Sequence, residues 1–408
     1  MKAVSHGRPA GRYASCQNSE VFREVKPWRG VSYSKGRCNV PADDQFIGSR
    51  EVPRRRLLQG VGALGVAASL RPTAAFEKGD DDEDQLGPFG PWSAPVNLGP
   101  VINSGANQIY NQTFPSISKN GLNLYFTSDR PGGVNAANPG KVTEIWVSKR
   151  ESLDAPWQIP VNLDTFINSI GSVGVGGANT AGSNFSPDEH FMFFWSPRPH
   201  PDACGIHTSD LYVTWRINRR NDFGWQEPVN LGCMINSPQF DNAPNYFEDE
   251  ENGTISIYFT SNRPGGPPGS QPGSFHIYVS TLGGDGLFGP AVLVPELSSA
   301  YDDTSTAIRH DGLEFFVRST RPEGRIGLED IFVSTRESTT DPWSTPVSLG
   351  RPINYPGYKT ASPNLSWDGT TLYFWSDRPG GFGGQDLYVS TRRKLGRNER
   401  EGEVGHQR

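Results

Sequence analysis

Cysteine, histidine and long hydrophobic runs are scarce in this sequence. The 408 residues include only four cysteines, and none of them forms a CxxC pair, so neither a zinc ribbon nor a thioredoxin-type redox motif is supported. The one apolar stretch, residues 57–70, is too short and too rich in glycine and alanine to span a membrane. A formal net charge of -6 offers no basic surface for nucleic acid or for an anionic membrane.

Turn-forming and aromatic residues are abundant instead. The chain contains 47 glycines and 34 prolines, and 11% of its residues are aromatic, whereas only 35% are hydrophobic. Many turns combined with many aromatic side chains are typical of short β-strands rather than of a helical core.

Residues 53–75 have the three-part layout of an export signal. Arg54, Arg55 and Arg56 precede the weakly apolar stretch 57–70, and Ala75 ends a run of small residues that suits cleavage. Consecutive arginines before a modestly hydrophobic segment resemble a twin-arginine signal, which implies a periplasmic or secreted protein. The alternative is a buried helix beside a basic patch.

The rest of the chain divides around this signal. We expect residues 1–52 to be a non-native or disordered extension, because translation that starts near Val52 would bring the signal to the N-terminus. Residues 76–90 are interpreted as an acidic, Gly/Pro-containing linker, residues 91–393 as the folded domain, and residues 394–408 as a disordered charged tail. The exported chain keeps Cys204 and Cys233, for which the sequence leaves a disulfide open.

Three short signatures recur five times through residues 92–392. The first is a strand-like run that ends in Ser-x-Arg-Pro, as in LYFTSDRPGG from Leu124. The second is a strand-like run such as DLYVSTR from Asp386. The third reads W..PVNLG..IN, as from Trp92, and is present in decayed form from Phe288. Internal self-similarity of this kind predicts a repeat architecture.

The order of the signatures predicts a ring. The repeat region begins with an isolated third signature at residues 92–103 and ends just after a second signature at residues 386–392. The first piece is therefore the signature that the last unit lacks. Turn dipeptides such as Asn120-Gly121 separate a further strand from the first signature, which gives four strands per unit. We therefore predict an all-β, five-bladed β-propeller with four-stranded antiparallel blades, closed when the N-terminal strand joins the last blade.

The repeat P-x-x-S-x-D-G-x-x-L-Y-F-x-S-x-R-x-G-G…D-L-Y-V-S resembles that of TolB-type, WD40-like (PD40-like) propeller proteins over residues 90–393. The resemblance implies the fold. It implies little about function, because such propellers include receptors, scaffolds and enzymes.

Residues repeated in every unit are expected to be structural. We predict that each arginine after the second strand pairs with the acid that begins the third strand, although a ligand-binding role is the alternative. The repeated tryptophans are expected to pack between blades rather than to serve as sugar platforms. The arginines are Arg130, Arg198, Arg263, Arg321 and Arg378, and the acids are Glu144, Asp210, Asp330 and Asp386, with His276 in the third unit.

Function is expected where the units differ, at the beginning of each inner strand. One polar level is predicted to contain Asn111, Asn179, Asp241, Asp302 and Lys359. The next level is predicted to contain Gln112, Thr180, Asn242, Asp303 and Thr360, with the register of the third unit open by one residue. Stacking faces are expected from Tyr110, Tyr301 and Tyr358. Such a funnel suits a hydroxyl-rich ligand, or it holds only ordered water.

These features favour a binding module that recognises a glycan, a cell-wall fragment or a protein partner in the cell envelope. The alternative is a glycoside hydrolase or lyase, for which Asp241, Asp302 and Asp303 are the candidate catalytic carboxylates. We expect a monomer without cofactor or nucleic-acid partner, although the polar ring could hold a cation such as calcium. His200, Cys204 and His207 are read as part of a loop rather than as a metal site.

Overall fold

The computed structural model describes residues 89–104, 110–135, 140–170, 179–199, 204 and 208–396. The predicted extension, export signal and nearly all of the linker lie outside these residues, as do His200, His207 and most of the predicted tail. Among the described residues, no helix is long and apolar enough to cross a membrane.

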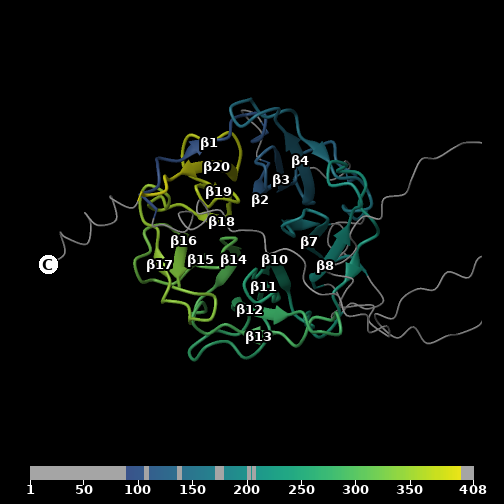
Figure 1. The fold of residues 1–408 in the computed structure, drawn as a ribbon. Coiled ribbons are helices and arrows are strands. Elements are labelled where there is room, and N and C mark those ends of the chain that lie inside the picture. Colours follow the sequence, from purple (N-terminus) through teal and green to yellow (C-terminus); the bar gives the residue numbers. More distant parts are fainter. Residues whose placement is uncertain are drawn as a thin grey trace, which may run out of the picture.

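The fold is a five-bladed β-propeller, as predicted, with one four-stranded antiparallel sheet per blade (Figure 1). Blade 1 contains β2 (Gln112–Ile117), β3 (Asn123–Ser128), β4 (Glu144–Lys149) and β5 (Val161–Asn162). Blade 2 contains β6 (Ala181–Phe185), β7 (Phe191–Ser196), β8 (Asp210–Trp215) and β9 (Val229–Asn230). Blade 3 contains β10 (Asp241–Glu248), β11 (Ile255–Ser261), β12 (His276–Thr281) and β13 (Val292–Leu293).

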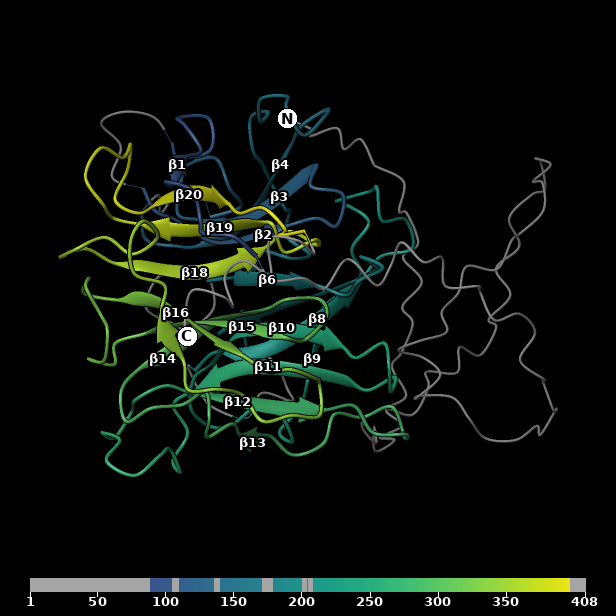
Figure 2. The same cartoon turned by 60° about the vertical axis from the view of Figure 1, so that its left-hand side comes forward.

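The last two blades repeat this plan. Blade 4 contains β14 (Asp303–Ile308), β15 (Glu314–Ser319), β16 (Asp330–Thr335) and β17 (Val347–Ser348). Blade 5 contains β18 (Thr360–Leu365), β19 (Thr371–Ser376), β20 (Asp386–Thr391) and, as its outer strand, β1 (Val96–Asn97). Val96 pairs with Val389 in antiparallel register, and Figure 2 shows β1 beside β20.

The core lies between the blades. The second strand of each blade is almost continuously apolar because neighbouring blades cover both of its faces. Phe193 packs with Tyr246 and Ile257 of blade 3, whereas the next residue, Phe194, packs with Tyr125 of blade 1. Successive side chains of one strand thus contact opposite neighbours, as the two-residue period of a strand requires.

The repeated tryptophans pack under arginines of their own blade, and Trp225 and Trp343 also belong to apolar clusters shared with the preceding blade, as the structural interpretation predicts. Trp225 is buried, with the Arg216 guanidinium 4.3 Å from its ring centroid. Trp343 lies in the same way under Arg336, at 4.1 Å. These stacks join the third and fourth strands of a blade.

The predicted pairing between each repeated arginine and the acid of the third strand is wrong. The arginine fork points back toward the preceding blade, where it donates to a main-chain carbonyl: Arg321 Nη2 donates to Leu297 O at 2.9 Å. The acids accept hydrogen bonds from the fourth strand instead, as Glu144 does from Asn162 Nδ2 at 2.7 Å. The arginines therefore tie neighbouring blades together, and the acids tie strands within a blade.

A disulfide joins Cys204 to Cys233, whose Cα atoms are 5.4 Å apart. It links the segment before β8 to the segment after β9, within blade 2.

Candidate functional site

The inner strands share one backbone feature that fixes their register. Each contains a residue in the left-handed region: Phe114 (φ 45°), Gly182 (φ 68°), Ala243 (φ 50°), Ser305 (φ 50°) and Ser362 (φ 50°). Counting back from this residue, Asp241 occupies the level of Asp303, and Phe240 the level of Asp302. The register of the third unit, open by one residue in the prediction, is therefore fixed with Phe240 and Asp241 at the two levels.

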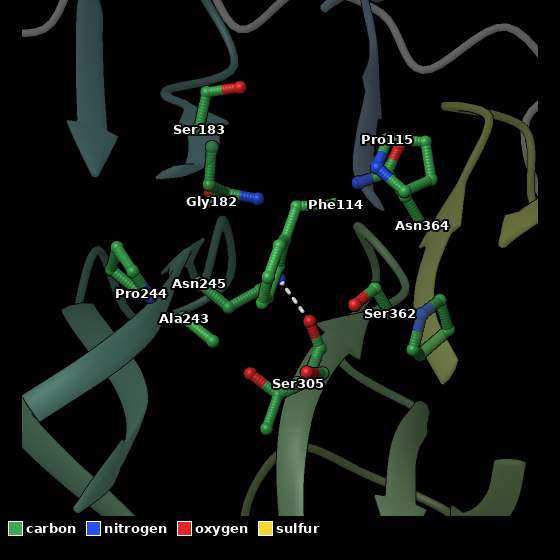
Figure 3. Close-up of a pocket in the computed structure, with 13 residues that line it drawn as sticks. Phe114, Pro115, Gly182, Ser183, Ala243, Pro244, Asn245, Ser305, Ser362 and Asn364 are labelled. Atoms are coloured by element: carbon green, nitrogen blue, oxygen red, sulfur yellow. Dashed lines mark hydrogen bonds between the residues drawn. The ribbon is translucent and has the colours of Figure 1, made fainter. Parts of the chain in front are cut away.

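These five left-handed residues surround the central channel and nearly fill it. Figure 3 shows them converging from the five blades, with Asn245 hydrogen-bonded to the neighbouring blade. The remaining cavity has a volume of about 20 Å³, which is room for about one water molecule. The channel thus separates two openings. We call them the entry mouth, where the inner strands begin, and the exit mouth, where they end.

At the entry mouth, two of the three candidate catalytic carboxylates are buried in ion pairs. Asp241 contacts Arg263 at 2.6 Å, and Asp303 contacts Arg321 at 2.6 Å, with both aspartates fully buried. Burial raises the pKa of the Asp241 carboxyl, and the Arg263 guanidinium opposes this shift. A carboxylate without solvent access that holds an arginine is placed to position a blade rather than to contact a substrate.

The other predicted ligand-binding residues of the entry mouth lie at blade junctions. Asn179 Oδ1 accepts from Thr143 N and Asp302 Oδ1 from Phe275 N, each at 3.0 Å and each across a junction. Further side-chain contacts of this set include Asn111 Nδ2 to Asp129 at 2.8 Å, Gln112 Nε2 to Ser104 at 2.6 Å, Asn242 with Ser209, and Lys359 Nζ to Glu329 at 2.9 Å. Tyr301 and Tyr358 are exposed and Tyr110 is half-buried. A ligand-binding role for this set remains a prediction.

The exit mouth contains a larger pocket that the sequence reasoning missed. Its volume is about 100 Å³, and all five blades line it through the ends of the inner strands and the hairpins that follow. The second residue of each hairpin differs in every blade: Lys119, Pro187, Glu250, His310 and Trp367. The signal was available, because this is the variable position of the repeated S-x-D-G turn.

Three glutamates from blades 2 and 3 line this pocket: Glu189, Glu248 and Glu250. Glu189 Oε1 accepts from the Lys119 backbone N–H at 2.6 Å, which joins blade 2 to blade 1. Glu248 Oε2 accepts from the Tyr246 hydroxyl at 3.2 Å. Tyr246 stands where the other inner strands have Ile117, Phe185, Ile308 and Leu365, and β10 continues two residues further to Glu248, so blade 3 adds a carboxyl at the end of a longer inner strand.

Glu189 also departs from the repeat in its backbone. The residue that closes each hairpin is glycine in the other four blades, with φ between 70° and 75°. Glu189 occupies this position with φ 57°. A non-glycine residue in the left-handed region costs on the order of 1 kcal/mol, and such strain concentrates at functional sites.

Trp367 is the aromatic centre of the pocket. The Lys119 ammonium lies 3.8 Å from its ring centroid, and the His310 ring lies 4.6 Å away with an interplanar angle of 31°. Burial lowers the pKa of the His310 imidazole. The carboxylates of Asp311 and Glu250 oppose this shift, whereas the cations Arg309 and Lys119 add to it. The imidazole is therefore neutral at pH 7. Its buried Nδ1 has no hydrogen-bond partner among the described residues.

Among the residues that the structure describes, no group of three or more His, Cys, Asp or Glu side chains is arranged to hold a metal ion. The exit mouth instead combines carboxylates, an indole and a neutral imidazole in one concavity. These are groups that can bind a hydroxyl-rich ligand and transfer protons.

No family model and no curated protein matches the sequence. Among solved structures, the chain is similar to a thermostable family-43 glycoside hydrolase (15% identity, 71% of this chain and 92% of that chain covered, TM-score 0.47). It is also similar to an α-L-arabinofuranosidase from Lactobacillus brevis (18% identity, 74% and 96% covered, TM-score 0.46). TolB from Acinetobacter baumannii matches with 15% identity, 70% and 55% covered, and a TM-score of 0.36.

These comparisons correct the prediction of a binding module. The two structures whose names state an activity are glycoside hydrolases, which was the alternative prediction from the sequence. At this identity the likenesses show the propeller fold alone and identify no catalytic residue. The functional argument therefore depends on the exit mouth.

Proposed function

We propose that the protein is a glycoside hydrolase whose active site is the pocket at the exit mouth. One observation carries the proposal: glutamates from two neighbouring blades and the Trp367 indole line a single concavity of about 100 Å³. Glycosidic bond cleavage requires two carboxyl groups beside the scissile bond, one to protonate the leaving oxygen and one to act as base or nucleophile.

The hydrogen bonds of the two carboxyls divide these roles. Glu189 accepts a backbone N–H, which suits an ionised, acceptor-only carboxylate, so we assign it as base or nucleophile. Glu248 contacts the Tyr246 hydroxyl, which can either donate or accept as the carboxyl gains or loses a proton, so we assign Glu248 as the general acid. His310, with its free Nδ1, would orient a sugar hydroxyl.

The retained strain at Glu189 supports its role. Glycine meets the same backbone requirement in the other blades without strain. A glutamate kept there at a cost in stability is explained by a carboxylate that the chemistry needs.

The test is reducing-sugar release from a panel of arabinan, xylan, cellulose, chitin and chitosan. We expect at least one polymer to be cleaved, and Glu248→Gln to lower kcat by about 10²–10⁴-fold, the usual contribution of a general acid. Glu251→Gln is the matched control, because Glu251 belongs to the same hairpin as Glu250 but does not line the pocket.

Two results would overturn the proposal. One is full activity in both Glu189→Gln and Glu248→Gln. The other is a folded protein that cleaves none of the polymers. If Asp302→Asn abolished activity while both glutamate variants kept it, the active site would belong to the entry mouth.

We also propose that the protein works outside the cytoplasm, in the periplasm or after secretion. The arginine-led segment 53–75 and the Cys204–Cys233 disulfide support this location. N-terminal sequencing of the protein from its native host is expected to begin near residue 76. A chain that retains residues 53–75 would contradict export.

A further inference from the structure

The pocket at the exit mouth is closed at its inner end. The left-handed residues of the inner strands leave only a cavity of about 20 Å³ in the channel behind it, which is too narrow for a sugar ring. Three asparagines line both cavities and form the floor of the pocket. Each accepts a backbone N–H of a neighbouring blade: Asn184 from Tyr246 at 2.8 Å, Asn245 from Ile308 at 3.3 Å, and Asn364 from Ile117 at 3.0 Å. Because these bonds hold the floor in place, a glycan chain cannot pass from one mouth to the other.

The wall of the pocket is higher on the side of blade 3. In the other four blades, the ladder between the first two strands ends at the pairs Ile117–Leu124, Phe185–Met192, Ile308–Phe315 and Leu365–Leu372. In blade 3, the ladder continues by two pairs beyond the corresponding Tyr246–Ile257 pair. Two strand residues add roughly 7 Å to this hairpin. We call residues 247–256, which form the longer hairpin, the blade 3 extension.

The blade 3 extension is held in place at its base and at its tip. At the base, Phe247 is buried in an apolar cluster with Phe315 of blade 4. At the tip, the Asp249 carboxylate accepts from Asn252 Nδ2 at 2.6 Å. Glu250, on the same tip, lines the pocket. Because packing and hydrogen bonds fix the extension, it forms a barrier at one edge of the mouth.

The pocket has room for one sugar ring. Its volume is about 100 Å³, whereas sites that enclose whole drug-sized ligands span about 300–1,000 Å³. All five blades contribute to its lining, so the pocket is surrounded by protein and opens only outward.

From the closed floor, the barrier at blade 3 and the small volume, and resting on the proposed function, we infer that the pocket binds the terminal residue of a glycan chain. The chain stands end-on in the mouth, and its remaining residues extend into solvent. The protein therefore releases sugars from chain ends and does not cut within a chain. The blade 3 extension determines this specificity, because a chain that lay across the mouth would have to pass through it.

The first test follows the products that the wild-type protein releases from the polymer that it cleaves. Release from chain ends gives one small product from the start while the polymer stays long, so the viscosity of the solution stays nearly constant as reducing sugar accumulates. Cutting within chains gives fragments of mixed length and a rapid fall in viscosity. We expect the first pattern, and the second would overturn the inference.

The second test measures binding and does not depend on cleavage. Oligosaccharides of three and of six residues, prepared from each of the five polymers, are titrated calorimetrically into the full chain carrying Glu248→Gln. We expect the trimer and the hexamer of the recognised sugar to have Kd values within about two-fold of each other, because the additional residues contact only solvent. A hexamer that binds at least about ten-fold more tightly would contact the protein along its length, which would overturn the inference.

Shortening the blade 3 extension tests its part in this specificity. Residues 247–256 are replaced with residues 118–123, the shorter hairpin of blade 1, and circular dichroism verifies that the variant folds. The hexamer is expected to bind this variant several-fold more tightly than the trimer, because a chain can then lie across the mouth. Glu251→Gln, which keeps the length of the extension, is the matched control and should leave the two Kd values equal. Equal Kd values in the folded, shortened variant would refute the role of the extension.

The outcomes separate this inference from the proposed function. Equal binding of trimer and hexamer by a protein that cleaves none of the polymers would uphold end-on binding and refute the hydrolase. Cleavage within chains that depends on Glu248 would uphold the hydrolase and refute the inference. Absence of binding by the oligosaccharides of all five polymers would also refute the inference.

Discussion

Replacing Asp303 with alanine should cost stability rather than chemistry. Asp303 is fully buried, and its Oδ1 accepts from Arg321 Nη2 and from Ser319 Oγ, each at 2.6 Å. Its Oδ2 accepts from the Ser299 backbone N–H and hydroxyl. Removing one partner of a buried ion pair leaves the other charge uncompensated, which costs about 3–5 kcal/mol.

Calorimetry or urea unfolding measures this loss, which corresponds to a fall in Tm of about 5–8 °C, because a domain of roughly 300 residues has an unfolding entropy of about 0.6 kcal/mol/K. Asp302→Ala is the neighbouring control, with a loss of about 1 kcal/mol, since it removes one backbone hydrogen bond. Asp303→Thr should recover part of the loss, because Thr180 and Thr360 occupy this level in blades 2 and 5 and accept from their arginines.

The reasoning would be refuted if the free energy of unfolding of Asp303→Ala lay within about 1 kcal/mol of the wild-type value. It would also be refuted if Asp303→Thr were no more stable than Asp303→Ala. Loss of activity at unchanged stability would restore Asp303 as a catalytic candidate.

Three further predictions concern other parts of the propeller. Glu189→Gly relieves backbone strain but loses one hydrogen bond, so stability should stay within about 1 kcal/mol while sugar release is lost; a large fall in Tm with activity retained would contradict this. Reducing the Cys204–Cys233 disulfide, which spans 29 residues of sequence, should lower the free energy of unfolding by about 2–4 kcal/mol, and a Tm indifferent to reductant would contradict this. Burial lowers the pKa of His276, and the carboxylates of Asp303 and Asp302 oppose this shift, so the folded state binds a proton at His276 less readily than the unfolded state. The free energy of unfolding is therefore unaffected by His276 above the ordinary pKa of about 6.5 and falls as the pH drops below it. Tm should therefore drop between pH 7.5 and 5.5, and a drop of equal size in His276→Gln would contradict that cause.

The architecture could be predicted from the sequence because repeats and their circular order are global signals. The register of the inner strands could not, because Phe114, Ala243, Ser305 and Ser362 adopt left-handed backbone without the glycine that usually indicates it. Only blade 2 has a glycine at this position.

The hydrogen-bond partners of the repeated arginines could not be predicted from the sequence either. Sequence shows an arginine and an acid at a fixed spacing in nearly every unit, but not that the guanidinium turns toward the preceding blade. That direction depends on how blades pack, as the Arg321–Leu297 contact shows.

The exit mouth could have been found by the rule that was applied to the entry mouth alone. Repeated positions build the blade and variable positions carry function, and the hairpin position of Lys119, His310 and Trp367 varies in every unit. What sequence could not reveal is that these hairpins meet around one pocket while left-handed inner residues nearly fill the channel behind it.

The most direct test of the account is a crystal structure of the Glu248→Gln variant with the oligosaccharide that the wild-type protein cleaves. We predict sugar density at the exit mouth, between Glu189 and Trp367. Sugar density at the entry mouth, beside Asp302 and Lys359, with an empty exit mouth would contradict the account.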